Sequence, residues 1–151
     1  MSIPPPHPLT PRGSKIAAGK GSATGFSRAV KLAVRKRAGN GDPDQARCEC
    51  CGIWLGRYGG QVQHVVARGM GGTSNPVLKT AANGALLHGT AQSGDHGLAE
   101  SRDPEMRRKG FWLPQGTDPR TVPMILWTGA EVWRSEDGRY HPEGPQEANA
   151  A

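Results

Sequence analysis

The clearest periodic pattern in the chain begins at Phe26. Apolar residues recur there at the spacing of one helix face: Phe26, Ala29, Val30, Ala33 and Val34. Basic residues occupy the other positions, and Gly39 suits the end of the helix, because glycine tolerates the backbone conformation that follows a last turn. The pattern predicts a basic amphipathic helix, whose charged side is either a phosphate-binding surface or an ordinary solvated face.

Short β segments and turns are expected after this helix. Residues 53–57 and 61–67 have the pattern of two short strands, and the Tyr-Gly-Gly sequence at 58–60 suits a hairpin turn between them. Residues 68–82 contain three glycines and a proline and are expected to form an extended loop. Short helical pieces are expected near Asn83 and His96. The Asp-Pro-Glu sequence at 103–105 is a strong helix start, with Asp as the cap and Pro in the first turn.

The last third of the chain has the pattern of β structure. Segments 124–127 and 131–134 are expected to pair across a turn at 128–130, with Trp112, Trp127 and Trp133 available for a small core. Short helices mixed with short antiparallel strands predict an α+β fold. We place one domain at residues 26–140, with its core at 47–110, between a disordered basic arm at 1–25 and a polar tail at 141–151.

Composition limits how such a domain can be stabilised. Only 35% of the 151 residues are hydrophobic, and 22 are glycine and 13 proline. A core this sparse usually needs an additional constraint, such as a structural metal. The three cysteines, Cys48, Cys50 and Cys51, form an odd-numbered cluster, which is typical of metal binding rather than of a disulfide framework.

The charge is high and unevenly distributed. The net charge is +6, and residues 1–47 alone carry nine Lys or Arg against two acidic residues. Such a basic front end favours a polyanionic partner, with nucleic acid first, although a merely solubilising charge is the alternative. No apolar run approaches the roughly 20 residues that a membrane span needs, and no hydrophobic segment resembles a secretory signal. We therefore expect a cytoplasmic protein without a membrane partner.

Three of the five histidines lie close together in the sequence. His64, His88 and His96 fall within 33 residues, downstream of the cysteine cluster. Hydrolysis of a phosphodiester needs an oriented base for the attacking water and a cation that stabilises charge on the phosphate. Histidine can serve as the base near neutral pH and can also bind the metal. His64 on a strand and His96 at a helix start could supply these two roles if that strand and helix pack together.

Three segments resemble the three-part signature of the HNH endonucleases. They are Gln-His-Val-Val-Ala-Arg-Gly-Met-Gly-Gly at 63–72, Asn-Gly-Ala-Leu-Leu-His at 83–88 and Gly-Asp-His-Gly at 94–97. More narrowly, the chain resembles the small HNH proteins of actinobacterial tailed phages. In those proteins a Cys-x-x-Cys knuckle precedes the first histidine and a Gly-Cys-His-Gly segment carries the last. The resemblance covers about residues 47–140.

The resemblance implies a ββα-metal fold with a zinc knuckle, and it implies roles for individual residues. His64 would be the general base, Asn83 would brace and orient the hairpin, and His96 would bind a catalytic Mg²⁺ or Mn²⁺ ion. Gln63 stands where the family often has an acidic or histidine metal ligand. Its amide oxygen can bind a hard cation, but less strongly because it has no charge.

The resemblance also implies a structural zinc site. Cys48 and Cys51 keep the first Cys-x-x-Cys pair, and His88 and Asp95 stand where the second cysteine pair would fall. Both replacements are zinc ligands, so a Cys₂-His-Asp site is expected. The alternative is a decayed site in which His88 is only a polar residue. Cys50 is the spare thiol.

These features predict a metal-dependent DNA endonuclease, a hydrolase that cuts phosphodiester bonds of double-stranded DNA. The expected DNA contacts are Arg68, as a phosphate clamp after His64, and the helix residues Arg28, Lys31 and Arg35. In the phages that it resembles, such proteins are associated with DNA packaging alongside the terminase. The alternatives are a catalytically inactive, zinc-stapled DNA-binding or packaging accessory module and an RNA-binding zinc knuckle. The sequence has neither a Gly-x-Ser-x-Gly elbow nor a phosphate-binding Gly-x₄-Gly-Lys loop.

Overall fold

A computed structural model of the chain describes residues 25–67 and 75–145. All but the last residue of the predicted basic arm at 1–25, and the predicted phosphate clamp Arg68, lie outside these residues. The described part is a mixed α+β fold with two small sheets and three short α-helices. Within it, no helix is long and apolar enough to cross a lipid bilayer.

Helix α1 (Arg28–Ala38) is the predicted basic helix. The Ser27 hydroxyl caps it by accepting a 3.2 Å hydrogen bond from the Val30 backbone, and Gly39 follows its last turn. Val34 is fully buried, as the apolar face predicts. Phe26 was also predicted on that face; it instead precedes the cap, although its side chain is still buried. A polar cap at position 27 therefore starts the helix two residues later than the apolar spacing suggests.

The strand pairing in the central sheet differs from the pairing that the sequence pattern predicts. Strand β1 (Gln61–His64) runs antiparallel to β2 (Gly84–Leu87), with Gln61 opposite Leu87 and His64 opposite Gly84. The prediction of a hairpin between 53–57 and 61–67 is therefore wrong. Trp54 instead forms an isolated antiparallel bridge with Arg47. Alternation of polar and apolar residues indicates which face of a strand is buried but does not identify its partner. Here β2, which is buried along its whole length, supplies the better apolar partner.

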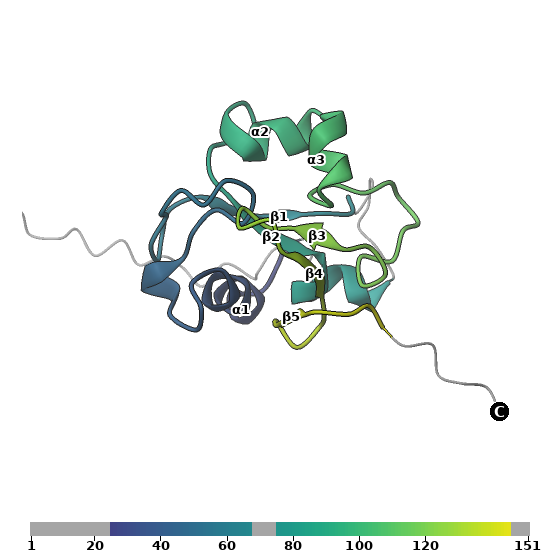
Figure 1. Cartoon of the computed structure of the whole chain (residues 1–151), viewed down its shortest axis with the longest axis horizontal. Coiled ribbons are helices and arrows are strands. Elements are labelled where there is room, and N and C mark those ends of the chain that lie inside the picture. Colours follow the sequence, from purple (N-terminus) through teal and green to yellow (C-terminus); the bar gives the residue numbers. More distant parts are fainter. Residues whose placement is uncertain (1–24, 68–74, 146–151) are drawn as a thin grey trace, which may run out of the picture.

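Helices cover both faces of this sheet (Figure 1). Helix α1 lies on one face, where Val34 packs with Ala81 and Leu86. Helices α2 (Gly94–Glu100) and α3 (Pro104–Arg108) lie on the other, where Ala85 and Leu87 join a larger core. The connecting turns include three short 3₁₀ helices, Pro43–Gln45, Pro76–Lys79 and Ala81–Asn83. The predicted helix start at 103–105 is confirmed, because the Asp103 carboxylate accepts the Glu105 and Met106 backbone N–H groups.

The C-terminal segment forms a second, three-stranded antiparallel sheet. Strand β3 (Met124–Ile125) pairs with β4 (Glu131–Arg134), which confirms the predicted hairpin, and β4 pairs with β5 (Tyr140–His141). The last strand extends one residue beyond the predicted end of the domain. Of the three tryptophans expected in this core, Trp112 packs against it and is partly buried, whereas Trp127 is 50% exposed. The large hydrophobic side chains that are fully buried here are Phe111 and Met124.

Candidate metal centre and its surroundings

Four side chains from three separate segments converge at one point. They are the four residues predicted for zinc, Cys48, Cys51, His88 and Asp95, whose ligand atoms all lie within 4.8 Å of one another. Cys48 Sγ is 3.3 Å from Asp95 Oδ2, and Cys51 Sγ is 3.3 Å from His88 Nδ1. His88 Nδ1 is 3.1 Å from Asp95 Oδ2.

This spacing fits a tetrahedral metal ion. Zinc bonds of about 2.0–2.3 Å place neighbouring tetrahedral ligands about 3.3–3.8 Å apart. The three shortest separations, between 3.1 and 3.3 Å, are close to that range. Two thiols, an imidazole and a carboxylate are all donor types that zinc accepts. The cluster could therefore hold a metal ion such as zinc.

Backbone geometry places each ligand. The turn at the cysteines is closed by two bonds, from the Cys48 N–H to Ile53 O (2.8 Å) and from the Gly52 N–H to Cys48 O (2.9 Å). The His88 N–H at the end of β2 points at Cys48 Sγ, 3.4 Å away. Such a donor stabilises negative charge on sulfur. Gly94 has φ +64, and a side chain there would meet the His88 ring at under 3 Å, so glycine lets Asp95 approach His88.

The cysteines differ in their surroundings. Burial raises the pKa of the Cys48 thiol to about 12, so this thiol becomes a thiolate near neutral pH only beside a cation. Cys50 is the spare thiol, as predicted from its position. Its sulfur lies 3.6 Å from Met106 Sδ and it is not a member of the four-residue cluster.

Glu49 lies inside the cysteine knuckle, residues 47–52, where it is buried and fixes the knuckle to the rest of the fold. Its carboxylate accepts two hydrogen bonds from Arg37, at 2.8 and 3.2 Å, and one from the Leu86 backbone at 2.8 Å. It also accepts the Tyr140 hydroxyl. One side chain therefore connects the knuckle to α1, β2 and β5. This anchor was missed in the sequence, because nothing local distinguishes Arg37 from the exposed basic residues of the same helix.

A second buried cation lies near this ion pair. Arg134 on β4 is 1% exposed, and its guanidinium nitrogens have no hydrogen-bond partner among the described residues. Burial, and then the charge of Arg37, lower the pKa of Arg134 to about 10. The charges of Arg37 and Glu49 are hydrogen-bonded to each other, whereas the attraction of Glu49 only partly offsets the burial of the Arg134 charge.

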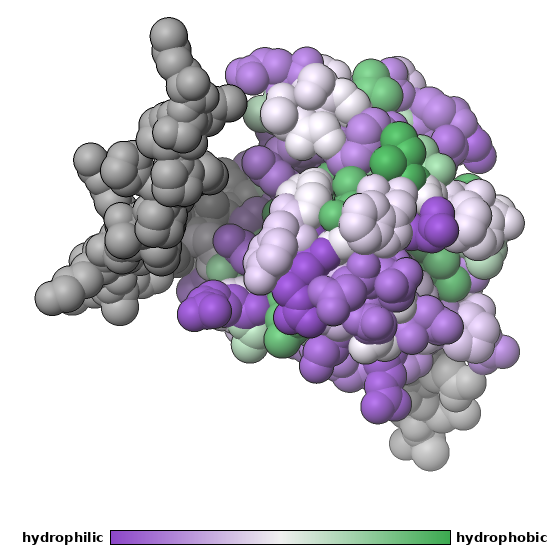
Figure 2. Space-filling view, turned by 90° about the vertical axis from the view of Figure 1, so that its left-hand side faces the viewer, coloured by the Kyte–Doolittle hydropathy of each residue, from purple (hydrophilic) through white to green (hydrophobic). Residues whose placement is uncertain are grey.

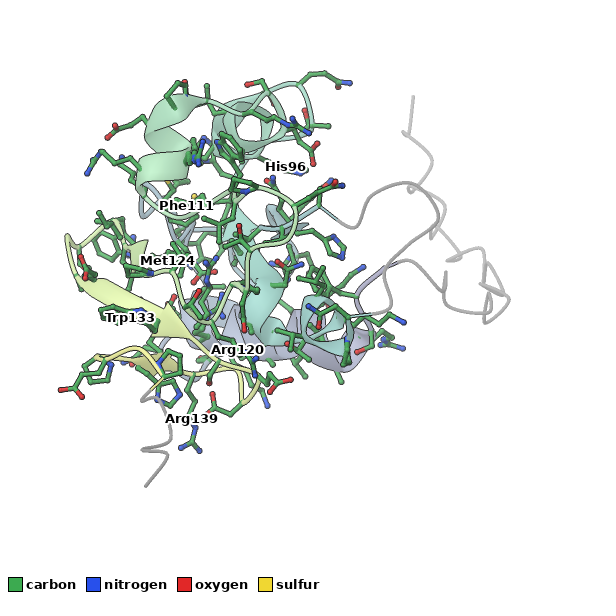
Figure 3. The ribbon with its side chains drawn as sticks, turned by 90° about the vertical axis from the view of Figure 1, so that its right-hand side faces the viewer. His96, Phe111, Arg120, Met124, Trp133 and Arg139 are labelled. Carbon is green, nitrogen blue, oxygen red and sulfur yellow. The ribbon has the colours of Figure 1, made fainter. Side chains whose placement is uncertain are left out.

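Two further predicted ligands are buried on the α2 side of the central sheet. Gln63 is opposite Ala85, which belongs to the core under α2 and α3, and His96 lies on α2 in that layer, away from α1 (Figure 3). Gln63 Oε1 and His96 Nδ1 are both buried and have no hydrogen-bond partner within the described part of the chain. The other ring nitrogen of His96 is 3.6 Å from a carboxylate oxygen of Glu100, one helical turn on. Glu100 was not singled out from the sequence, although its i,i+4 spacing from His96 could have signalled it.

His64 has a different environment. Its ring stacks on Phe26, with centroids 3.9 Å apart and planes 8° from parallel. Its strand neighbour Val62 packs in the core under α1, so by the alternation of a strand His64 leaves β1 on the face opposite Gln63. The stack fixes the plane of the imidazole ring.

Asn83 is fully buried between the two central strands. Its side-chain oxygen accepts the Val66 N–H at 2.7 Å, and its nitrogen donates to Val66 O and Leu78 O. The Val65 N–H also donates to the Asn83 carbonyl at 2.9 Å. Asn83 therefore ties the chain that leaves β1 to the chain that enters β2.

The predicted DNA contacts on α1 divide into two kinds. Arg28 and Lys31 are exposed. Arg35 is used within the protein, because its guanidinium donates to the carbonyls of Gly56, Gly59 and Gly60, at 3.3, 2.7 and 3.3 Å. Arg35 therefore holds the turn before β1 rather than offering its donors to phosphate.

Comparison of the chain with models of protein families, with curated proteins and with solved structures finds no match. The functional assignment therefore depends on the chemistry of these residues and on the resemblance in the sequence.

Proposed function

We propose that the chain is a metal-dependent DNA endonuclease of the HNH type, with a structural zinc ion at Cys48, Cys51, His88 and Asp95. In this proposal the strands β1 and β2 and the helix α2 are the ββα unit. Double-stranded DNA is the substrate, and the partner that the resemblance implies is a phage terminase during DNA packaging.

One observation carries the proposal: two metal-binding atoms, Gln63 Oε1 and His96 Nδ1, are buried without a partner on the same side of the central sheet. Leaving such atoms unpaired costs about 1–3 kcal/mol each, so a structure rarely retains two of them without a ligand. An amide oxygen and an imidazole nitrogen suit Mg²⁺ or Mn²⁺.

The surroundings of His96 agree with a metal ligand. A histidine that binds a metal through one nitrogen usually has its other nitrogen oriented by a carboxylate, and Glu100 lies 3.6 Å from Nε2. The His96 backbone N–H also donates to His88 O at 3.0 Å. The zinc cluster and the proposed catalytic ligand are thus held in one short segment, so an intact cluster would keep His96 in place.

The chemistry divides among few residues. A divalent ion held by Gln63 and His96 would stabilise negative charge on the phosphate and the leaving oxygen. His64 would take the proton of the attacking water, in a ring orientation set by Phe26. Asn83 would keep the end of β1 in register, and the exposed Arg28 and Lys31 would contact the DNA backbone.

The alternative is a zinc-stapled DNA-binding module without catalysis. Its supporting observation is that Gln63 supplies no charge and that His64 leaves β1 on the other face of the sheet from Gln63. Both proposals keep the zinc cluster and the basic surface, so only an activity measurement separates them.

The test is cleavage of supercoiled plasmid in Mg²⁺, in Mn²⁺ and in EDTA. Cleavage should require the divalent ion, and His64→Ala should lower the rate by about 10²–10⁴-fold while leaving DNA affinity nearly unchanged. Gln63→Ala should raise the metal concentration needed for half-maximal rate, whereas Gln61→Ala, an exposed glutamine on the same strand, is the matched control. Cleavage in EDTA, or a His64→Ala variant that cuts at the wild-type rate, would contradict the proposed metal-dependent endonuclease mechanism.

A further inference from the structure

Two tryptophan rings beside the cysteine knuckle lie on glycines and expose much of their surface. A side chain at Gly52 would meet the Trp127 ring at 2.6 Å, and one at Gly56 would meet the Trp54 ring at 2.9 Å. Both glycines are buried and have positive φ, +79 and +65. The two tryptophans remain 50% and 59% exposed. One face of each indole therefore packs on glycine backbone, and much of the remaining ring surface is exposed to solvent.

The guanidinium group of Arg47 lies beside the Trp127 ring. Arg47 and Trp54 face each other in an antiparallel bridge, so their side chains leave the backbone on the same side. The Arg47 guanidinium carbon is 5.7 Å from the centroid of the Trp127 ring, and its NH1 is held by Gly52 O at 2.9 Å. The aromatic platform, which we define as Trp54, Trp127 and Arg47, therefore combines two exposed indoles with a fixed positive charge.

Two other large hydrophobic residues of the segment that carries Trp54 are also exposed. Ile53 is 51% exposed and Tyr58 is 89% exposed. Residues 40–60 lie on the left-hand side of the molecule in Figure 1, and Figure 2 shows that side facing the viewer. Near-neutral and hydrophobic residues lie there among the hydrophilic ones. The charge of the Asp44 carboxylate is offset by the Arg57 guanidinium 2.6 Å away, so Asp44 adds little repulsion toward a polyanion.

We infer that the aromatic platform binds single-stranded DNA by stacking unpaired bases on Trp54 and Trp127, with Arg47 beside them to attract the phosphates. Exposed aromatic rings next to basic side chains are the usual arrangement of single-strand binding surfaces, because every base offers a flat face whatever its identity. Duplex DNA keeps its bases stacked on one another and cannot use the rings. A chain with net charge +6 is suited to a polyanion. The inference shares with the proposed function only its nucleic-acid partner.

The test compares two fluorescent probes of equal phosphate number, oligo(dT) and an abasic oligonucleotide, with the full chain in EDTA. Because EDTA prevents metal-dependent cleavage, the result does not depend on whether the protein is a nuclease. The wild-type protein should bind oligo(dT) more tightly than the abasic strand. Trp127→Ala and Trp54→Ala should each weaken oligo(dT) binding about 5- to 150-fold and leave abasic binding unchanged, since stacking on one ring is lost.

Three further variants sharpen the result. Trp127→Phe keeps a ring and should retain most of the affinity, whereas Arg47→Met should weaken binding of both probes. Leu98→Ala removes an exposed apolar side chain from α2 and is the control for general loss of surface hydrophobicity. Melting temperatures confirm that each variant is folded. The decisive measurement is the ratio of the affinities for oligo(dT) and for the abasic strand. If this ratio in the folded Trp54→Ala/Trp127→Ala double variant equals that of the wild type, the inference is overturned, and a protein would be the better candidate ligand for the platform.

Discussion

Cys48→Ser should unfold the domain rather than only weaken its metal binding. Cys48 is the fully buried member of the metal cluster, and it belongs to the knuckle that Glu49 fixes to α1, β2 and β5. A serine hydroxyl is a poor ligand for a metal such as zinc, and its shorter side chain would lie farther from the His88 N–H than the sulfur does. The substitution would therefore remove one of the two thiol ligands and alter the acceptor that faces the His88 N–H.

The size of the effect follows from how much the metal contributes. Apparent binding free energies of structural zinc are about 10–16 kcal/mol, and they appear as folding free energy. A domain of this size has a net stability of only about 5–15 kcal/mol. Loss of zinc should therefore leave no stable fold at 25 °C. Asp95→Ala should be milder, because three ligands remain and water can complete the site.

The assay is elemental analysis of protein purified without added metal, followed by thermal melts with and without a zinc chelator. We expect about one zinc per chain and a cooperative melt that disappears on chelation. Cys50→Ser is the matched control, since Cys50 lies in the same knuckle and contacts Met106 and Asp95 but is not one of the four clustered ligands. This variant should keep both zinc and melting temperature. The reasoning would be refuted by zinc-free protein that melts at the same temperature as the untreated sample.

Other expectations concern charge. Arg134→Met should raise stability, because the depressed pKa of Arg134 corresponds to about 3 kcal/mol of unfavourable burial of its charge; a lower urea midpoint than wild type would contradict this. Arg37→Met should lower stability by up to about 3–5 kcal/mol in the same measurement, because it removes the cation that is hydrogen-bonded to the buried Glu49 carboxylate. Lys31→Ala should reduce the salt dependence of DNA binding, whereas Arg35→Ala should lower the melting temperature with little change in that slope. Gln63→Asp should lower the Mg²⁺ concentration that supports half-maximal cleavage, and an unchanged titration would place Gln63 outside the metal site.

Local signals in the sequence predict the elements better than their partners. The caps at Ser27 and Asp103 act within a few residues, so the helices that they start are readable from the chain. The pairing of β1 with β2 is not, because 19 residues separate His64 from Gly84 at the end where they meet, beyond the range of any turn signal. A two-glycine turn before β1 suggested a hairpin, but its carbonyls instead accept hydrogen bonds from Arg35.

The cysteine cluster alone indicated metal binding, but the full set of four ligands was predictable only through the resemblance. His88 and Asp95 have no recognisable spacing relative to Cys48 and Cys51 on their own, and the structure shows that positive-φ glycines around them create the approach. The buried network of Arg37, Glu49 and Tyr140 could not be inferred at all. Its members come from three distant segments, and each residue type is ordinarily found at the surface or at its boundary.

The hydrogen bond between Glu49 and Tyr140 has a consequence for synthesis of the chain. These residues are 91 positions apart, so the knuckle leaves the ribosome long before its last hydrogen-bond donor is made. Arg37 precedes Glu49 and can pair with it early, whereas the Tyr140 hydroxyl arrives only when the final strand emerges. A nascent chain that stalls before Tyr140 would carry a cysteine knuckle whose anchoring Glu49 carboxylate lacks one of its four hydrogen bonds. Pairing of β5 with β4 is therefore the step that brings the last hydrogen-bond donor to Glu49.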